Sequence, residues 1–300
     1  MSDSPGRLEA AFFPAMRRIA LATCEKFVSL TDDDRLLIAP LRSRGFAAEP
    51  AVWSDPDVPW SGCDAVILRS CWDYHLRLAD FLAWIGWLEK AGVRLWNPPD
   101  MVRWNADKSY LRDLESRGIP IVPTLWPEER VSLLQQLRAL GWDRAVIKPR
   151  VSATAHRTML VSADDAADAQ SLADELLAGP GVMVQQFMDG IRTNGEWSLI
   201  FFSAKFSHAV IKIPRAGDFR VQHDFGGSEE SAEAPREIRE AAARVVAALE
   251  QVPLYARVDG VESGGRFLLM ELELIEPALF LGFTGDAAHR FAKSVSDHLR

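Results

Sequence analysis

The first hundred residues alternate between short apolar runs that suit buried strands and longer mixed runs that suit helices. Residues 19–22, IALA, are the first apolar run, and we predict the first buried strand there. Alternation of this kind is typical of an α/β layer with a mostly parallel sheet. We expect this layer to end near residue 100, at the Pro98-Pro99 pair. Its segments read RRIALATC, DDDRLLIAPLRSRG, AVWSD, CDAVILRSCW, LADFLAWIGWLEKAG and VRLWNPP.

Two further blocks follow, with no internal repeat. The second starts with a helix-like segment at residues 100–118 and contains the short strand candidates AVIKP and VMVQQF. The third has longer strand candidates, an Ala- and Glu-rich helix at 235–250, and a hairpin-like pair, YARVDGV and RFLLMELELI. We therefore predict a tail over 1–15, an N-terminal parallel α/β domain over 16–100, and two α+β subdomains over 101–187 and 188–300.

Composition and charge narrow the possible partners. The 300 residues, 48% of them hydrophobic, are enough for two or three packed domains. A formal charge of −8 without any Lys/Arg-rich run argues against a nucleic-acid partner. No apolar stretch approaches the roughly 20 residues that span a membrane. Three cysteines without CxxC spacing predict no disulfide framework or zinc site, and a cytoplasmic location; a homodimer remains open.

Carboxylates interrupt the apolar run LLMELELIEP at residues 268–277. Glu271 and Glu273 share one face of the predicted strand, because strand side chains alternate between faces. Arg257 and Asp259 share a face of the preceding strand in the same way. We expect a three-residue loop at 263–265, which gives the register that brings Asp259, Glu271 and Glu273 together.

Three carboxylates around one point are ligands for a hard cation, and Mg²⁺ is the usual one where phosphates complete its coordination. The alternative is an exposed strand face whose glutamates pair with Arg or Lys across the sheet. Two lysines favour the first interpretation. Lys148 ends the strand AVIK before Pro149, and Lys108 lies near a helix start that Asn105 or Asp107 could cap.

Phosphate-binding loops of the common kinds are missing from the sequence. It contains no GxxxxGK[ST], and no GxGxxG follows the first strand, so neither a P-loop nor a Rossmann dinucleotide site is supported. The segment PRVSATAHRT after Lys148 is rich in small and hydroxyl residues. We predict that residues 152–156 form a flap over phosphates.

These motifs and their order, from about Arg17 onward, resemble the ATP-grasp superfamily of carboxylate-amine ligases, which includes D-alanine ligase, glutathione synthetase and the ribosomal-protein glutamate ligases. The resemblance implies an ATP-grasp fold, with ATP between two α+β subdomains. It assigns the phosphates of ATP to Lys108 and Lys148, and the adenine to the hinge strand at 184–188. The implied ATP-binding residues there are Gln185, Gln186, Phe187 and Met188, with Gln186 in place of the more usual acid. Glu196 is the first candidate for holding the ribose, and Asp189 is the second.

The same resemblance assigns the metal to Asp259, Glu271 and Glu273, and the stabilisation of the acyl-phosphate to Arg257. Arg220 would lie near the phosphates, and Gly226 and Gly227 near the acceptor. The family motif Glu-x-Asn reads Glu-Leu-Glu here, so the number of ions, one or two Mg²⁺ or Mn²⁺, stays open. The implied reaction converts a carboxylate to an acyl-phosphate, which an amine then attacks to give ADP, phosphate and an amide.

The substrate end of the site is predicted at LRSCWDYH, residues 68–75, because open α/β sheets bind ligands at the carboxyl ends of their strands. We expect Arg69 to bind a small amino-acid-like carboxylate, with Ser70, Trp72, Asp73 and Tyr74 around it. The alternative is that Trp72 and Tyr74 only pack between domains and Arg69 pairs with Asp73. His223 is the one histidine that we consider as an acid-base group.

The pattern as a whole is most similar to a small-molecule branch that includes the O-ureido-serine cyclo-ligase of cycloserine biosynthesis. Joining two separate amino acids would need the same ATP machinery. An alternative of another class is a nucleotide-binding regulatory protein without ligase activity. A complete set of lysines, arginine and metal acids argues against it, and the missing glycine fingerprint disfavours an α/β oxidoreductase.

Overall fold

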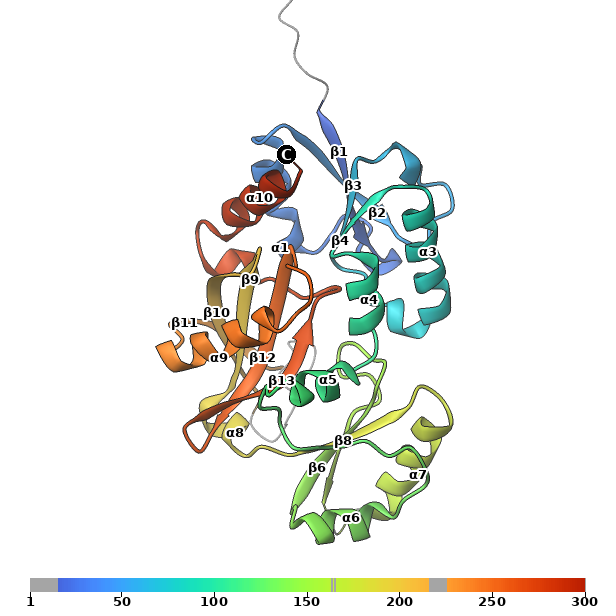
Figure 1. The fold of residues 1–300 in the computed structure, drawn as a ribbon, viewed down its shortest axis with the longest axis vertical. Helices are drawn as coiled ribbons and strands as arrows, with labels where there is room; N and C mark the ends of the chain where they lie inside the picture. Colours follow the sequence, from blue (N-terminus) through green and yellow to red (C-terminus); the bar gives the residue numbers. More distant parts are fainter. Residues whose placement is uncertain (1–15, 163, 165, 216–225, 300) are drawn as a thin grey trace, which may run out of the picture.

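A computed structural model describes residues 16–162, 164, 166–215 and 226–299. Three sheets follow one another along the long axis of the molecule, with the N-terminal sheet at one end and a small lid sheet at the other (Figure 1). No helix in this part of the chain is both long and apolar enough to cross a bilayer.

The N-terminal sheet is parallel throughout, as predicted, and its strand order is β2-β1-β3-β4. Helix α3 (Leu78–Lys90) packs on it through Phe81, Ile85 and Leu88, which are buried at the spacing of one helix face. The other elements of this layer are β1 (Arg17–Thr23), η1 (Glu25–Phe27), α1 (Asp32–Arg35), α2 (Ile38–Arg42), β2 (Phe46–Val52), η2 (Trp60–Gly62), β3 (Ala65–Leu68), η3 (Tyr74–Leu76) and β4 (Arg94–Trp96).

The lid sheet is antiparallel, with the order β5-β8-β6-β7, and helices α6 and α7 share its apolar core. Helix α6 (Leu133–Leu140) has clear end signals in the sequence: the Ser132 hydroxyl accepts from the Gln135 amide, and Gly141 ends the helix in the left-handed region. The remaining elements are β5 (Thr124–Leu125), β6 (Arg144–Pro149), β7 (Met159–Ser162), α7 (Ala166–Ala178) and β8 (Val182–Gln186).

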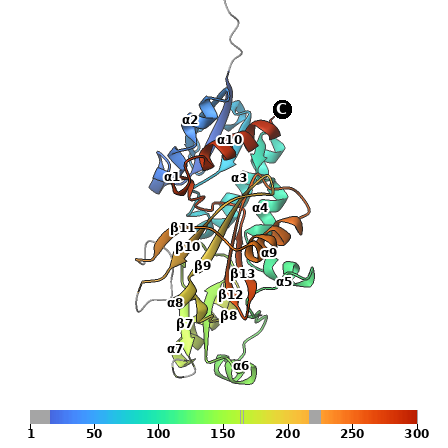
Figure 2. The ribbon, with the colours of Figure 1, turned by 90° about the vertical axis from the view of Figure 1, so that its left-hand side faces the viewer.

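The third sheet is antiparallel and lies between the other two, with the order β11-β10-β9-β12-β13 (Figure 2). Helix α9 (Arg236–Ala247) covers it with Ile238, Ala242, Val245 and Val246, again one helix face. Its other elements are α8 (Gly190–Asn194), β9 (Glu196–Phe202), β10 (Lys205–Ile213), β11 (Ser228–Ala232), β12 (Tyr255–Ser263), β13 (Arg266–Glu273), η5 (Leu281–Phe283) and α10 (Ala287–His298).

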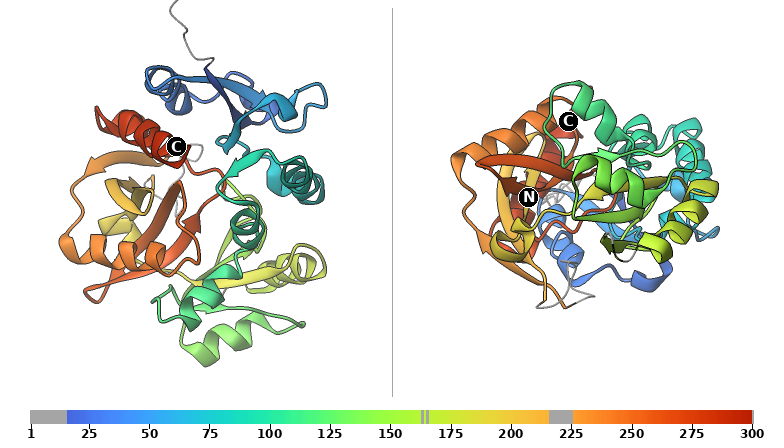
Figure 3. Two further views of the ribbon diagram at one scale, coloured as in Figure 1. Left: turned by 45° about the horizontal axis from the view of Figure 1, so that its top comes forward. Right: turned by 90° about the horizontal axis from the view of Figure 1, so that it is seen from below.

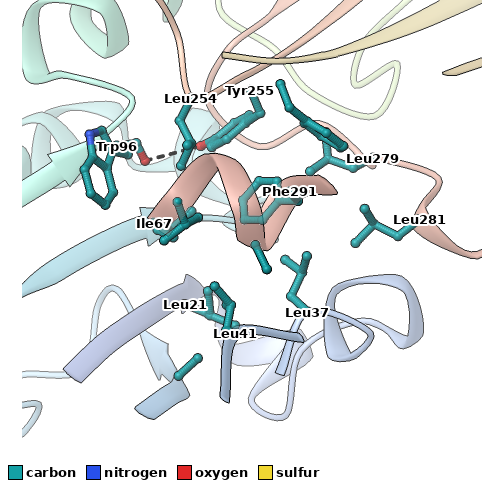
Figure 4. Close-up of a cluster of buried hydrophobic side chains, with 14 of the residues drawn as sticks. Leu21, Leu37, Leu41, Ile67, Trp96, Leu254, Tyr255, Leu279, Leu281 and Phe291 are labelled. Atoms are coloured by element: carbon teal, nitrogen blue, oxygen red, sulfur yellow. Dashed lines mark hydrogen bonds between the residues drawn. The ribbon is translucent and has the colours of Figure 1, made fainter. Parts of the chain in front are cut away.

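The chain crosses between layers in two places. Helices α4 (Pro99–Asn105) and α5 (Tyr110–Ser116) belong to the predicted lid range, but α5 packs with Leu269 and Leu272 of the third sheet. Helix α10 returns to the N-terminal layer, where Phe291 joins one core with Leu21 and Leu37 (Figure 4). The left view of Figure 3 shows α10 (Ala287–His298), in red, beside the N-terminal layer, in blue. Each predicted range holds one sheet, whereas the helices tie the ranges together.

The hairpin of β12 and β13 differs from the predicted three-residue loop. Ser263 pairs with Arg266 across the two-residue turn Gly264-Gly265, and both glycines have the positive φ that this tight turn needs. A bulge then shifts the register, so that Asp259 pairs with Glu271 and Arg257 with Glu273. Asp259, Glu271 and Glu273 therefore lie on one face of the sheet, as predicted. The bulge, and not the length of the loop, produces this register.

The lid meets the N-terminal layer through two histidines. The rings of His75 in η3 and His156 after β6 lie 5.2 Å apart, and the His75 Nδ1 is buried with no partner among the described residues. Burial and the neighbouring His156 lower the pKa of His75 to about 4; Lys108 adds to the lowering, and Asp73 opposes it.

We expect removal of the Phe291 ring to destabilise the whole protein, because the ring joins the first and last elements of the fold. Phe291→Ala should lower the free energy of unfolding by about 3–5 kcal/mol, measured by urea titration. Phe283→Ala, at a side of η5 where the ring is 36% exposed, is the matched control and should cost far less. Equal losses in both variants would contradict this assignment of the core.

We expect the contact at His75 to weaken in acid. Because its folded pKa lies below the ordinary value of 6.5, the unfolded state takes up a proton first, and stability is lost as the pH falls from about 6.5 towards 4. His75→Asn should flatten the dependence of melting temperature on pH in this window, whereas the exposed control His289→Asn should not. If the melting temperature of His75→Asn depended on pH as steeply as that of the wild type, the role of His75 in this loss of stability would be refuted.

Candidate active site

A cavity of about 260 Å³ lies where the three layers meet. The N-terminal layer contributes Trp72 and Tyr74, the lid contributes β6, β8 and the segment after Pro149, and the third sheet contributes its acids. Its charged lining residues among the described ones are Lys108, Lys148, Lys212 and Arg257, with Glu196, Glu229, Asp259, Glu271, Glu273 and Glu276. Six carboxylates thus face four cations.

Arg257 organises the acids of the hairpin. Its Nε and Nη2 donate to the carboxylate of Asp259 at 2.9–3.0 Å, and its Nη2 also donates to Glu273. Asp259 further accepts from the Ser198 hydroxyl at 2.5 Å, with the Lys212 Nζ 3.4 Å away. Burial alone would raise the pKa of Asp259, but Arg257 and Lys212 hold it below its ordinary value. Asp259 is therefore ionised and fully enclosed.

Glu271 and Glu273 are more open to the cavity, with side chains 29% and 22% exposed. The Lys108 Nζ lies 3.1 Å from Glu271 Oε1, and Lys108 and Lys148 outweigh burial, so that the pKa of Glu271 is lowered. Burial raises the pKa of Glu273 to about 7, against the opposing charge of Arg257. Further positive charge beside Glu273 would therefore favour its ionised form.

The donor set fits a hard divalent cation, although no such site is preassembled. In the described ranges, no three His, Cys, Asp or Glu side chains already stand as ligands around one point. Instead, Arg257 and Lys108 occupy oxygens of the three predicted metal acids. The cavity has more carboxylates than cationic side chains among its described residues, and Mg²⁺ prefers oxygen ligands of this kind. Binding it would require Glu271 and Glu273 to turn from their present partners.

Three lysines from separate segments line the cavity. Lys108, just before α5, donates to the Ser152 carbonyl at 2.6 Å, and Lys148 on β6 donates to Gln185 at 3.0 Å. Burial lowers the pKa of Lys148. Lys212 on β10 contacts Glu196 at 2.5 Å and was not predicted. A signal for it existed, since AVIK occurs both at 145–148 and at 209–212.

The predicted cap residues act differently. Asn105 ends α4 and bonds to the backbone of Leu272 and Leu274, so it does not cap α5. Asp107 accepts from the Ser109 amide at 2.8 Å and from Arg150, and thereby holds the turn beside Lys108.

The segment after β6 borders the cavity as the sequence predicts for a flap. Ser152 to Ala155 line the cavity together with Thr158. Thr154 and Ala155 have φ of 51° and 55°, and Arg157 has 53°, in the left-handed region that favours glycine. Conformations of this kind are costly for residues with a Cβ, so the segment is suited to change shape when a ligand binds.

The predicted hinge residues Gln185, Gln186, Phe187 and Met188 all line the cavity, as does Glu196. The Gln186 amide is bonded to the Pro123 carbonyl, and the Phe187 amide to that of Arg144. Burial raises the pKa of Glu196, which Lys212 opposes. Asp189, the second candidate for the ribose, pairs with Arg144 and does not line the cavity.

The prediction for Arg69 and Ser70 is wrong, because neither side chain reaches the cavity. Arg69 is 1% exposed and pairs with Asp34 at 2.8 Å, not with Asp73, the partner weighed in the alternative. Ser70 is buried against Thr23. Of the other residues in this motif, Asp73 accepts from the Trp53 indole at 2.7 Å, also away from the cavity, and only Trp72 and Tyr74 line it.

The predicted loop at 217–227 is described only at its end. Arg220 and His223 lie outside the described residues. Gly226 and Gly227 immediately precede β11 and do not line the cavity, although Glu229 on that strand does. Tyr110 and Glu276 line it as well and were not predicted as site residues. Glu276 belongs to the same carboxylate-bearing run as Glu271 and Glu273, whereas the polar segment around Tyr110 gave no sign of its role.

Comparisons with known proteins identify the family of the chain. Residues 19–97 match the family model "D-cycloserine synthetase DcsG, N-terminal domain", and residues 121–275 match "Prokaryotic glutathione synthetase, ATP-grasp domain". The chain is 32% identical to "Cycloserine biosynthesis protein DcsG" of Streptomyces lavendulae, covering 94% of this chain and 99% of that protein.

Solved structures give the same result. The crystal structure of D-cycloserine synthetase DcsG has a TM-score of 0.86 at 31% identity, covering 94% of this chain and 100% of the other. D-alanine–D-alanine ligase of Bacillus anthracis in complex with ATP has a TM-score of 0.67 at 18% identity, covering 94% and 97%, and so shows the fold alone.

The ATP-grasp fold is thus confirmed, and the alternatives of a regulatory nucleotide-binding protein and an oxidoreductase are set aside. The relatives that carry this evidence match along nearly the whole chain, and the solved structure among them is a synthetase. The chain belongs to the ATP-grasp superfamily of ATP-dependent carboxylate-amine ligases, within the family of DcsG.

Proposed function

We propose that this ligase activates the carboxylate of an O-ureido-serine-type amino acid and closes it into a ring. The observation that carries the proposal is that the N-terminal layer forms part of the cavity wall. Residues 19–97 match the DcsG N-terminal family model, and this region supplies Trp72 and Tyr74 beside the acids. Function is carried by the site and not by the fold, so a match in the layer that forms part of the cavity wall supports the substrate class.

The described residues divide naturally between the two substrates. Lys108, Lys148 and Lys212 would neutralise phosphate oxygens of ATP, because all three line the cavity. The hinge segment 185–188 would hold the adenine, and Glu196 the ribose. Arg257 would face the carboxylate under activation, since its guanidinium already lies among Asp259 and Glu273.

Mg²⁺ would be held by Glu271 and Glu273, with Asp259 behind them, and Mn²⁺ has similar oxygen preferences. When bound, the metal supplies charge neutralisation on the phosphates and polarises the transferred phosphoryl group. The excess of carboxylates over cations favours two ions, because ATP brings further negative charge into the same cavity. Glu273, which stands where the family motif has an asparagine, would give the second metal ion a charged ligand.

The reaction balances as two transfers. A carboxylate oxygen of the substrate attacks the γ-phosphorus of ATP, and ADP leaves, which gives an acyl-phosphate. The ureido nitrogen next to oxygen then attacks the acyl carbon, loses its proton, and phosphate leaves with the oxygen that it received. Because water would destroy the intermediate, Ser152 to His156 would close over the cavity during the reaction.

We expect phosphate release from ATP and Mg²⁺ to depend on one carboxylate in a panel of serine, alanine, O-ureido-serine and other O-substituted serines. Glu271→Gln should reduce it at least about 100-fold, because it removes a metal ligand and the partner of Lys108. The exposed Glu262→Gln is the matched control. Substrate-dependent release that survives in Glu271→Gln would refute the metal assignment, and release with alanine alone would refute the cyclisation.

A further inference from the structure

Glu276 is the one buried acid of the cavity for which the described residues supply no partner. Its side chain lines the cavity and the residue is 8% exposed. Glu196, Asp259, Glu271 and Glu273 each pair with a lysine or an arginine. Within the described part of the chain, no side chain or amide donates to the Glu276 carboxylate.

Electrostatics make this arrangement unfavourable for the empty protein. Burial first, and then the neighbouring Glu273, raise the pKa of Glu276 well above its ordinary value, although Lys108 and Arg257 pull the other way from a distance. A buried carboxylate without a cation costs several kcal/mol when ionised. The group therefore either keeps a proton or receives a cation from a ligand.

The backbone around Glu276 is held firmly, so its position is built into the fold. The Trp72 indole donates to the Glu276 carbonyl at 2.9 Å, and Arg69 donates to the Pro277 carbonyl at 2.6 Å. Arg257 donates to the next carbonyl, that of Ala278, at 3.2 Å. Arg69 and Trp72 come from the N-terminal layer, so this layer fixes the backbone at Glu276. Arg69 does so from outside the cavity.

The surroundings of Glu276 suit an ammonium group better than a metal ion. Trp72, Ala278 and Phe280 line the same cavity and offer no oxygen from their side chains. Tyr74 is the nearby phenol, and no hydrogen bond of its hydroxyl is formed within the described residues. One carboxylate, one hydroxyl and aromatic faces match the three donors and the charge of an ammonium, whereas Mg²⁺ needs several oxygens.

We propose that Glu276 binds the free ammonium group of the amino-acid substrate, with Tyr74 as a second acceptor, and so selects amino acids with an unmodified amine. This inference rests on the proposed function, since it places that substrate in this cavity. It assigns the substrate class: carboxylates without an ammonium, and amino acids whose nitrogen is acylated, are rejected at this position.

The test compares substrates that differ only at the amine. Wild type, Glu276→Gln and the exposed control Glu262→Gln are assayed for ring product and ADP with O-ureido-serine, its N-acetyl derivative and 3-(ureidooxy)propanoate, which lacks the amine. In Glu276→Gln, kcat/KM for O-ureido-serine should fall about 10- to 100-fold, mainly through KM. KM for ATP and the rate with 3-(ureidooxy)propanoate should not change, so discrimination is lost.

A second measurement keeps the inference testable if the panel gives no ring product. Calorimetry on wild type with ADP and Mg²⁺ compares serine with glycerate, in which a hydroxyl replaces the ammonium. Wild type should prefer serine, Glu276→Gln should not, and Glu276→Asp should recover part of the preference if both fold.

The outcomes separate the two claims. Equal handling of amine-bearing and amine-free ligands by wild type, or equal losses for both in Glu276→Gln, would overturn the inference and leave the ligase proposal intact. No ADP with any member of the panel, together with a serine preference that depends on Glu276, would overturn the proposed cyclisation and support the ammonium site.

Discussion

The burial of charge at the junction of the three sheets is the constraint on which the rest of the structure depends. Ionised side chains out of water must be paired, and here the lysines and the arginine come from separate segments of the lid and of the third sheet. Lys108 precedes α5, Lys148 lies on β6, Lys212 on β10 and Arg257 on β12. The acids on β12 and β13 are therefore stabilised only if all of these elements meet, which places the cavity at the junction.

The chain after β13 shows how the same junction is tied to the N-terminal layer. Carbonyl oxygens of residues 276–278 accept from Trp72, Arg69 and Arg257 in turn, and His208 contacts those of Leu279 and Phe280. The segment lacks regular structure, so side chains satisfy the carbonyls that a strand would otherwise pair. This arrangement gives LRSCWDYH a role: it positions the wall of the cavity, and only Trp72 and Tyr74 reach it.

Local patterns in the sequence were enough to predict much of the fold. Burial is visible in the sequence itself for the apolar run around Ile67 and for the helix that contains Phe81 and Ile85. The parallel layer was therefore predictable. The alternation that places Glu271 and Glu273 on one face also holds. The bulge that aligns them with Asp259 was not predictable, because it depends on how the turn and the strand ends fit together.

Partners far apart in the sequence are the part that local patterns miss. Nothing near Arg69 indicates that Asp34 neutralises it, and a buried ion pair and a substrate-binding arginine look alike in one sequence. Lys212 is a site residue that local patterns missed, since it contacts Glu196 on the adjacent strand β9 and Asp259 on β12, the next strand beyond β9. Its repeated AVIK motif was the only local sign.

Activation of the substrate carboxylate by phosphoryl transfer in this cavity can be followed with O-ureido-serine labelled with ¹⁸O in its carboxylate, by mass spectrometry of the phosphate released. One labelled oxygen should appear in the phosphate, because the acyl-phosphate breaks between carbon and that oxygen. Phosphate that forms together with product yet carries only unlabelled oxygen would contradict this activation.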